Sequence, residues 1–267
     1  MKQSETIQYK NFATVYDMFM DNVPYDEWAE YLHELLVERG VKGGIICELG
    51  CGTGRMTRKL RDYGYDMIGI DISQEMLQVA ADKEKKGVAG EIMYLNQDMR
   101  EFELYGTVAA VVCICDGMNY IMEEEDLLKV FKLVNNYLDP NGVFIFDMNT
   151  PYYYKNILGE RTICENREEG SFIWENYYDV GSRINEFDMT LYIGRNSEDP
   201  KTKKPVSLYE RYEETHYQKA YRQADVKSLL KKAGLRDIEI FEALTHDTPK
   251  RNTERVYYIS REFGKMG

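Results

Sequence analysis

Three glycines at every second position follow an acidic residue in the segment "ICELGCGTGR", residues 46–55. Glu48 precedes Gly50, Gly52 and Gly54, and such a turn lets a ligand lie close to the backbone because glycine has no Cβ. A phosphate-binding P-loop requires G-x-x-x-x-G-K-[S/T], but position 55 is arginine and no such lysine follows. A dinucleotide fingerprint requires G-x-G-x-x-G, and here the third glycine comes one residue early. The spacing therefore excludes a P-loop and weakens NAD binding without excluding it.

Two further acidic residues follow successive predicted strands. Asp71 closes the strand in "GIDIS", 21 positions after Gly50, and Asp98 follows the next strand in "NQDM". An acid about 20 residues after a glycine turn can bind both hydroxyls of a ribose, because each carboxylate oxygen accepts one hydroxyl proton. Either residue alone could be a turn, cap or loop acid. Together they lie at successive strand ends, where open α/β sheets bind their ligands, and they favour one shared site.

The spacing acid-x-G-x-G-x-G resembles the first motif of the class I S-adenosylmethionine-dependent methyltransferases, which "ELGCGTG" at 48–54 matches throughout. This ligand has no phosphates, so glycines that open the backbone to its sulfonium and amino-acid end suit it. Glu48 can hold the turn or meet the positive charge of the ligand. The resemblance implies S-adenosylmethionine as cofactor and S-adenosylhomocysteine as product.

The resemblance also assigns the donor-binding residues. Asp98 would accept from the adenine amino group while Met99 flanks the ring, and Asp71 would hold the ribose. The full set is Glu48, Gly50, Cys51, Gly52, Gly54, Asp71, Ile72, Asp98, Met99 and Cys115.

Strands and helices alternate around these motifs. Apolar runs predict five strands, and helical spacing predicts the helices between them; several of the helices are delimited by glycine, proline or an N-cap such as Ser73. The predicted strands are 43–50, 66–73, 91–99, 108–119 and 142–149. The predicted helices are 11–20, 25–40, 53–64, 73–87 and 123–142. Apolar strands separated by helices indicate a parallel sheet covered on both faces.

This rhythm breaks after the fifth strand. Alternating segments between 151 and 220 predict antiparallel strands, after which a helix at 224–234 and two strands at 235–244 and 254–262 complete the chain. We therefore predict an α/β, Rossmann-like class I methyltransferase fold with a seven-stranded, mostly parallel sheet and helices on both faces. Residues 1–150 and 221–267 would form the core with its N-terminal helices, and 151–220 an antiparallel β insertion.

Composition argues against several classes of partner. The net charge is −12 and the only compact basic stretch is "KTKKP" at 201–205, which disfavours large RNA or DNA substrates because phosphate contacts need basic side chains. No apolar run approaches the roughly 20 residues that span a bilayer, and the N-terminus lacks the apolar core of a signal peptide. Five cysteines without framework spacing argue against a secreted disulfide scaffold, and three histidines supply few metal ligands. We expect a cytoplasmic protein with no membrane, nucleic-acid or metal partner.

Three residues are catalytic candidates on the acceptor side. Tyr16 lies in "NFATVYDMFMDNVPYDEW", which is similar to an N-terminal segment of uncharacterised bacterial methyltransferases, of sugar N,N-dimethyltransferases and of glycine N-methyltransferases. Tyr120 follows the fourth strand, and His216 lies in the insertion. Each of them could instead be a packing residue. Asp116 and Asn119 also follow the fourth strand and are candidate polar groups of the pocket, although Asn119 could simply cap a turn.

The predicted activity is methyl transfer to an N or O nucleophile of a small molecule. Proximity and orientation supply most of the catalysis, and a base is needed only when the nucleophile arrives protonated. The tyrosine-rich insertion is expected to act as a lid, as in the similar enzymes, or as the surface of a homodimer, because aromatic residues also enrich interfaces. The alternatives are an RNA or protein methyltransferase and a non-catalytic protein that binds S-adenosylmethionine.

Overall fold

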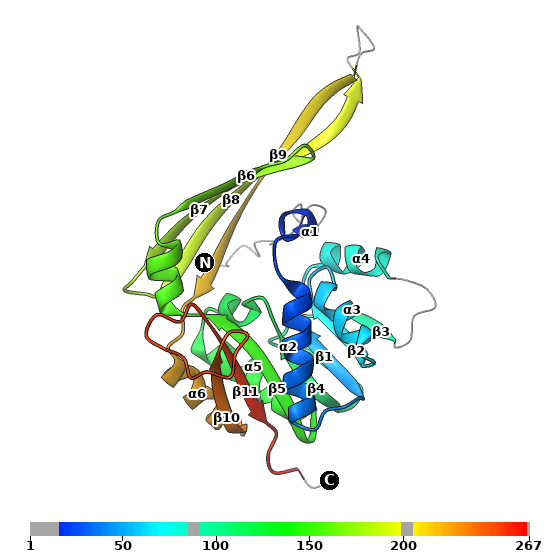
Figure 1. Ribbon diagram of the computed structural model, residues 1–267, viewed down its shortest axis with the longest axis vertical. Coiled ribbons are helices and arrows are strands. Elements are labelled where there is room, and N and C mark those ends of the chain that lie inside the picture. The colour runs from blue at the N-terminus through cyan, green and yellow to red at the C-terminus, as the bar shows by residue number, and fades with distance from the viewer. Residues whose placement is uncertain (1–15, 85–90, 199–204, 266–267) are drawn as a thin grey trace.

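A seven-stranded sheet forms the centre of the computed structural model, which describes residues 16–84, 91–198 and 205–265. Its strands lie in the order β10-β11-β5-β4-β1-β2-β3 (Figure 1). The pairs among β1 to β5 are parallel, whereas β11 runs antiparallel to both β5 and β10. This confirms the predicted mostly parallel sheet. The strands are β1 (Ile45–Leu49), β2 (Asp66–Asp71), β3 (Ile92–Asn96), β4 (Val108–Cys113), β5 (Leu138–Asn149), β10 (Arg236–Glu242) and β11 (Arg255–Arg261).

Helices follow the predicted segments with shorter bounds. They are α1 (Tyr16–Phe19), α2 (Tyr25–Glu38), α3 (Arg55–Asp62), α4 (Gln74–Asp82), α5 (Glu124–Tyr137) and α6 (Gln223–Lys232), together with the 3-10 turn η2 (Gly117–Tyr120) and the π-helical turn η3 (Tyr153–Leu158). Ser73 is the N-cap of α4, as predicted, because its hydroxyl accepts from the backbone N–H of Met76 at 3.2 Å. The prediction missed η3, since the segment after β5 was assigned to strands alone. Residues 11–15 of the first predicted helix lie outside the described residues.

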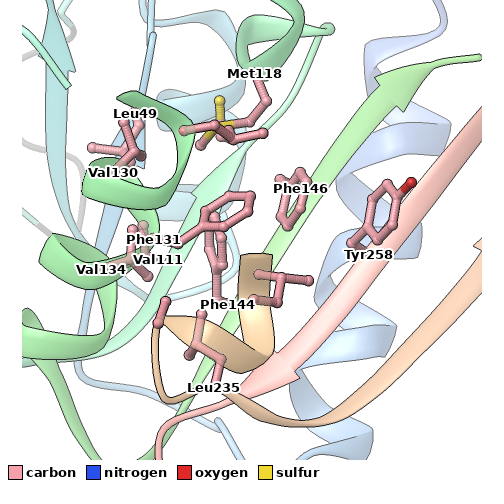
Figure 2. Packing of buried hydrophobic residues seen from close by; sticks show 14 of the residues in the cluster. Leu49, Val111, Met118, Val130, Phe131, Val134, Phe144, Phe146, Leu235 and Tyr258 are labelled. Carbon is pink, nitrogen blue, oxygen red and sulfur yellow. The ribbon is translucent and has the colours of Figure 1, made fainter. Parts of the chain in front are cut away.

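Helices cover both faces of the sheet because strand side chains alternate between two cores. The first core contains residues of β4 and β5 such as Val111, Phe144 and Phe146, packed against α5 and α6. In Figure 2 the rings of Phe131, Phe146 and Tyr258 lie together, and the last two stack with centroids 4.8 Å apart. The intervening strand residues enter a second core with α2 and α3. Neither apolar face of the sheet is left uncovered, which explains why the strands read as continuous apolar runs.

A second sheet follows β5, as predicted. It contains four antiparallel strands in the order β6 (Thr162–Asn166), β7 (Gly170–Asp179), β8 (Ile184–Glu198) and β9 (Pro205–Lys219). Figure 1 shows it extending away from the seven-stranded sheet, with α1 lying between the two. One of its faces carries an apolar cluster: Phe187, Met189 and Leu191 of β8 pack against Phe19 of α1. Within the described residues, no helix is both long and apolar enough to cross a membrane.

Asn119 of η2 links the two sheets where the chain passes from one to the other. Its amide nitrogen donates to the carbonyl oxygens of Asn149 at 3.2 Å and Lys219 at 2.8 Å, and its oxygen accepts from the N–H of Asn149 at 3.0 Å. Asn149 ends β5 and Lys219 ends β9, so one side chain bonds the chain where it leaves the core and where it returns. Asn119 is 0% exposed, so it is a structural link rather than the pocket-lining group that its position suggested.

Replacing Asn119 by alanine should therefore destabilise the protein. Asn119→Ala removes three hydrogen bonds and leaves buried backbone groups unpaired, which we expect to lower the free energy of unfolding by about 2–4 kcal/mol. Urea denaturation measures the loss. Asn156→Ala, which removes an exposed amide bonded only to the Tyr152 carbonyl, is the matched control. A loss no larger than in the control contradicts the structural assignment of Asn119.

Candidate active site

The glycine turn lies where β1 ends and α3 begins, at the edge of the sheet where the parallel strands have their carboxyl ends. Gly50, Gly52 and Gly54 have φ angles of 69°, 53° and 70°, in the left-handed region that side chains disfavour. The N–H of Gly52 donates to Asp71 Oδ2 at 2.8 Å, and the N–H of Cys51 donates to the carbonyl of Ile70 at 3.0 Å. These bonds hold the turn against the end of β2, so Glu48, Asp71 and the three glycines lie at the same edge of the sheet.

The glycines differ in what surrounds them. A Cβ at Gly54 would overlap the Tyr94 hydroxyl and lie 3.0 Å from the Cβ of Ala80, so protein atoms already fill that space. A Cβ at Gly52 would meet nothing within 4 Å. Only Gly52 therefore presents bare backbone to open space where a ligand could approach, whereas Gly54 is required by packing. A Cβ at Gly50 would lie at ordinary contact distance, 3.4 Å, from Met99.

Glu48 points into the protein and bonds to α3. It is 3% exposed, and its carboxyl accepts from the hydroxyl of Thr57. Burial raises the pKa of the Glu48 carboxyl to about 8, and the hydrogen bond from Thr57 opposes only part of that shift. Of the two roles expected for this acid, the contacts support holding the turn. A carboxyl that is largely protonated at neutral pH is a poor partner for a cation.

Asp71 connects three backbone segments. Its Oδ2 accepts from Gly52 N–H, and its Oδ1 accepts from Ser73 N–H at 2.8 Å at the start of α4. Burial raises the pKa of this carboxyl, and backbone hydrogen bonds from Ser73, Gly52 and Ile72 oppose the shift. Each carboxylate oxygen has a further lone pair, so Asp71 can accept two more hydrogen bonds without losing these. The next residue, Ile72, is 66% exposed beside it.

Asp98 is paired with Arg100 after β3. The guanidinium Nε of Arg100 lies 3.0 and 2.9 Å from the two carboxylate oxygens of Asp98. Burial raises the pKa of the Asp98 carboxyl, but hydrogen bonds from Arg100 outweigh this and hold the pKa below its ordinary value. Met99 between them packs against the core and reaches toward Gly50.

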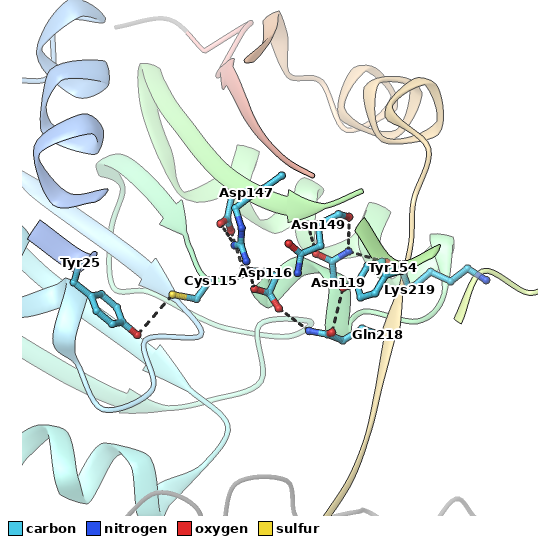
Figure 3. Close-up of polar contacts among 10 residues, drawn as sticks. Tyr25, Cys115, Asp116, Asn119, Asp147, Asn149, Tyr154, Gln218 and Lys219 are labelled. Atoms are coloured by element: carbon cyan, nitrogen blue, oxygen red, sulfur yellow. Dashed lines mark hydrogen bonds and ion pairs between the residues drawn. The ribbon is translucent and has the colours of Figure 1, made fainter. Parts of the chain in front are cut away.

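Cys51 and Cys115, the two cysteines predicted to bind the ligand, have side chains that contact other parts of the protein. The Sγ of Cys51 would lie 3.0 Å from a Cβ placed on Gly69, so this side chain faces β2. Cys115 has a φ of 65°, and its Sγ donates to the hydroxyl of Tyr25 in α2 at 3.8 Å (Figure 3). Any contact of Cys51 with a ligand would therefore involve its backbone. All five cysteines are free thiols, and among the described residues no group of three or more His, Cys, Asp or Glu side chains could hold a metal ion.

An ionic network follows the end of β4. The guanidinium of Arg255 donates to Asp116 Oδ1 at 2.8 Å and to Asp147, while Gln218 of β9 donates to Asp116 Oδ2 at 2.6 Å (Figure 3). Burial lowers the pKa of the Arg255 guanidinium, but the carboxylates of Asp147 and Asp116 outweigh this and hold it above its usual value. Asp116 and Arg255 side chains are each 20% exposed, so the network borders open space. Asp116 is partly exposed, and its carboxylate also binds Gln218 of the insertion; its expected role as a polar group of the pocket stays a prediction.

The catalytic candidates Tyr120 and His216 lie together, although they are 96 residues apart. The edge of one ring faces the other, with centroids 6.1 Å apart and planes at 79°. His216 also stacks on Phe187 of β8, at 4.7 Å, and its Nε2 lies 3.2 Å from Glu214 Oε2.

Tyr16, the third candidate, lies in α1, the helix that connects the glycine turn to the second sheet. Tyr16 packs against the cluster of Phe19 and the apolar residues of β8. The following residue, Asp17, accepts from Thr53 Oγ1 in the glycine turn at 2.6 Å. The carboxylate of Asp21, just after α1, accepts hydrogen bonds at 2.8 Å from both terminal nitrogens of Arg167, a residue of the insertion. The structure thus brings Tyr120 and His216 together, whereas Tyr16 lies with the apolar cluster between α1 and β8.

Comparison with known proteins agrees with this geometry. A model of the methyltransferase domain matches residues 46–142. The chain is 30% identical over 255 residues to YqeM of Bacillus subtilis (strain 168), which carries a provisional methyltransferase assignment; the match covers 95% of this chain and 97% of YqeM. The crystal structure of an S-adenosylmethionine-dependent methyltransferase from Clostridium acetobutylicum ATCC 824 superimposes with a TM-score of 0.81 at 28% identity, covering 96% of this chain and 99% of that one.

The chain belongs to the class I S-adenosylmethionine-dependent methyltransferases. It is accordingly an enzyme, as predicted. This methyltransferase is also similar, at 25% identity over 151 residues, to the dTDP-3-amino-3,4,6-trideoxy-α-D-glucopyranose N,N-dimethyltransferase of Streptomyces venezuelae. That similarity covers 55% of this chain and 60% of the relative.

Sequence reasoning missed several polar residues of the methyltransferase. Asp147 interrupts the apolar run of β5, and a buried acid requires a partner, so its presence in a network could have been suspected. Its partner Arg255 lies 108 residues away, and Gln218 and Glu214 carry no local signal. Only the fold brings these side chains to the end of β4.

The buried carboxyl of Glu48 predicts a pH dependence of stability. Folding takes up a proton at Glu48 between its ordinary pKa of 4.5 and the folded value of about 8. Its contribution to stability is therefore fully present below pH 4.5 and is lost as the pH rises through 8. Glu48→Gln keeps the hydrogen bond from Thr57 without a charge, so the melting temperature of the variant relative to wild type should rise from pH 5 to pH 9. A difference that stays flat, as expected for the exposed control Glu30→Gln, contradicts the assignment.

The two types of glycine can be separated by alanine substitution. Gly52→Ala adds only the backbone cost of a left-handed conformation, about 1–2 kcal/mol. Gly54→Ala adds the overlap with Tyr94 and Ala80 and should lose about 1–3 kcal/mol more. Urea denaturation of both variants without ligand measures the difference, and equal losses would show that packing does not determine position 54.

Proposed function

We propose that this methyltransferase transfers the methyl group of S-adenosylmethionine to an N or O nucleophile of a small molecule. The observation that carries the proposal is the hydrogen bond from the N–H of Gly52 to Asp71. This bond places the open backbone at Gly52 beside a carboxylate that can accept further hydrogen bonds. An amino-acid portion and a ribose can be bound side by side at such a place.

The donor would then lie across the ends of β1, β2 and β3. The two remaining lone pairs of Asp71 would accept the ribose hydroxyls. The exposed side chain of Ile72 and the side chain of Met99 offer apolar contact to the faces of the adenine. Asp98 would accept a hydrogen bond from the adenine amino group while keeping its ion pair with Arg100. S-adenosylmethionine supplies an activated methyl group, and the enzyme supplies orientation and a dry site.

Two properties support a small acceptor. The net charge of −12 disfavours a polyanionic substrate such as RNA. Beyond the ends of the strands, the side chains of Tyr120 and Asp116 are both partly exposed, an aromatic and a polar group suited to orienting a small molecule. The relative from Streptomyces venezuelae, named as an amino-sugar N,N-dimethyltransferase, is consistent with such an acceptor.

We further propose that residues 151–220 form a lid over the acceptor and the surface of a homodimer in the cytoplasm. Their inner face packs on α1, whereas Tyr177, Leu208, Tyr209 and Tyr217 are exposed large side chains on the same sheet. Sedimentation equilibrium measures the molar mass in solution and so tests the dimer. Tyr209→Glu should shift the equilibrium from dimer to monomer.

Ligand-induced stabilisation tests the donor proposal. Thermal unfolding is measured with S-adenosylmethionine, S-adenosylhomocysteine or NAD, and we expect the first two to raise the melting temperature. Stabilisation by NAD alone would overturn the proposal. The acceptor class is then tested with pairs of primary amines and alcohols that share a carbon skeleton, by measuring formation of S-adenosylhomocysteine. Methylation of RNA or protein substrates instead would refute the small-molecule assignment.

Asp71→Asn should weaken donor binding at least tenfold, because a charged acceptor of hydroxyl groups contributes about 1.5–3 kcal/mol. Asparagine is preferred to alanine here, because its oxygen can keep one of the two backbone hydrogen bonds that organise the turn. Calorimetric titration with S-adenosylhomocysteine measures the affinity. Asp82→Asn, at an exposed position near the end of α4, is the control. Equal affinities in the two variants would refute the ribose assignment.

A further inference from the structure

The end of β4 carries one carboxylate more than its arginine needs. Arg255 donates to Asp147, which is 0% exposed and lies in the adjacent strand β5. That pair alone balances the charge of the guanidinium, yet a second acid, Asp116, also accepts from Arg255 at 2.8 Å. Gln218, the other side chain that donates to Asp116, is uncharged (Figure 3). Two carboxylates around one guanidinium leave an unbalanced negative charge.

Asp116 is the member of this group that solvent reaches with that charge. Both oxygens of the buried Asp147 accept from donors, one from the backbone N–H of Asp116 at 2.8 Å and the other from Arg255. The side chain of Asp116, by contrast, is 20% exposed. Glu254, which precedes Arg255 in the chain, is exposed and acidic as well. The potential at this place therefore favours a positively charged ligand group.

The backbone at the end of β4 is held in a costly conformation. Cys115 and Asp116 have φ angles of 65° and 53°, so two successive residues with side chains are left-handed. Strain of this kind concentrates at binding sites, where the surrounding structure maintains it. Val112 of β4 pairs with Glu48 of β1, two residues before Gly50. Asp116 therefore follows the strand next to the one that ends in the glycine turn.

Aromatic side chains accompany the carboxylate. Tyr120 ends the 3-10 turn that begins just after Asp116, and Tyr153 begins η3; both are partly exposed. Burial raises the pKa of the Tyr153 hydroxyl, and the charge of Asp116 raises it further, so the two groups lie within electrostatic reach. A partly exposed carboxylate with aromatic rings near it is the composition that suits an ammonium group, through charge and through the faces of the rings.

We propose that Asp116 is a specificity-determining residue that binds the amino group of the acceptor, which makes the acceptor an amine. The inference rests on the proposed function and narrows its N or O nucleophile to nitrogen. An alcohol can donate a hydrogen bond but brings no positive charge, so it gains less from the unbalanced carboxylate. Arg255 and Gln218 are positioning residues, because each holds one oxygen of Asp116.

Three probes that share a ring and differ in their polar group test the charge preference: cyclohexylamine, cyclohexanol and cyclohexanecarboxylate. Ligand-observed NMR measures their dissociation constants on protein saturated with S-adenosylhomocysteine. We expect wild type to bind the amine about tenfold or more tightly than the alcohol, and the carboxylate most weakly. An amine that binds no more tightly than the alcohol, including failure of all three to bind, overturns the proposal. This comparison needs no substitution, so it stands even if a variant fails to fold.

Asp116→Asn removes the charge and keeps an oxygen that can accept from Gln218 or Arg255. It should weaken the binding of cyclohexylamine about tenfold and leave that of cyclohexanol nearly unchanged. Glu125→Gln removes one negative charge from an exposed position of α5 and is the matched control, which should keep the preference for the amine. Equal affinities of the two variants for cyclohexylamine overturn the proposal.

Gln218→Leu separates recognition by charge from a purely structural role. This variant breaks the same link between Asp116 and the insertion but retains the carboxylate. We therefore expect Gln218→Leu to keep the preference for cyclohexylamine. A loss as large as that in Asp116→Asn would mean that the placement of the insertion determines the preference, and the proposal would be wrong.

Turnover gives a second readout with the paired amines and alcohols of the acceptor panel. The amines should have the higher kcat/KM, and Asp116→Asn should raise KM for the amine about tenfold with little change in KM for S-adenosylmethionine. A higher kcat/KM for the alcohols overturns this inference and leaves methyl transfer itself in place. If S-adenosylhomocysteine fails to bind, the proposed function fails instead, so the two failures are distinct.

Discussion

The amide of Asn119 is the constraint on which the placement of the second sheet against the first depends. It bonds the carbonyl of Lys219 and both backbone groups of Asn149, so it sets where β9 enters the core. Once that point is set, strand alternation places Gln218 against Asp116 and the residues two and four positions earlier, His216 and Glu214, on the inner face. A single buried side chain thereby orients a row of buried polar side chains that begins one residue away.

A second connection holds the insertion at its other end. Helix α1 is too short to be stable alone, and it is held by the glycine turn through Asp17 and Thr53 and by the insertion through Asp21 and Arg167. Its apolar face packs on β8. The donor turn and the second sheet therefore share a structural element.

Local patterns and long-range contacts differ in how far the sequence predicts them. The glycine turn, the alternating elements and the cap at Ser73 depend on neighbouring residues, and each was predicted within a few positions. The role of Asn119 depends on a carbonyl 100 residues away, and the charge of Asp147 is balanced by Arg255 at a distance of 108 residues. Such pairs leave no local signal. The same limit applies to Gly54, which sequence reasoning attributed to ligand access and which packing against Tyr94 explains.

Three acids end or follow three neighbouring strands, and their surroundings give them different capacities. Glu48 is buried with a single hydroxyl donor, so it is largely protonated at neutral pH and stabilises α3. Asp98 is already neutralised by Arg100, so it can accept from a neutral amino group but adds little net charge. Asp71 accepts from the backbone amides of Gly52 and Ser73, so it joins the glycine turn to the start of α4. Three acids at neighbouring strands therefore differ because one is bonded by a hydroxyl, one by a guanidinium and one by backbone amides.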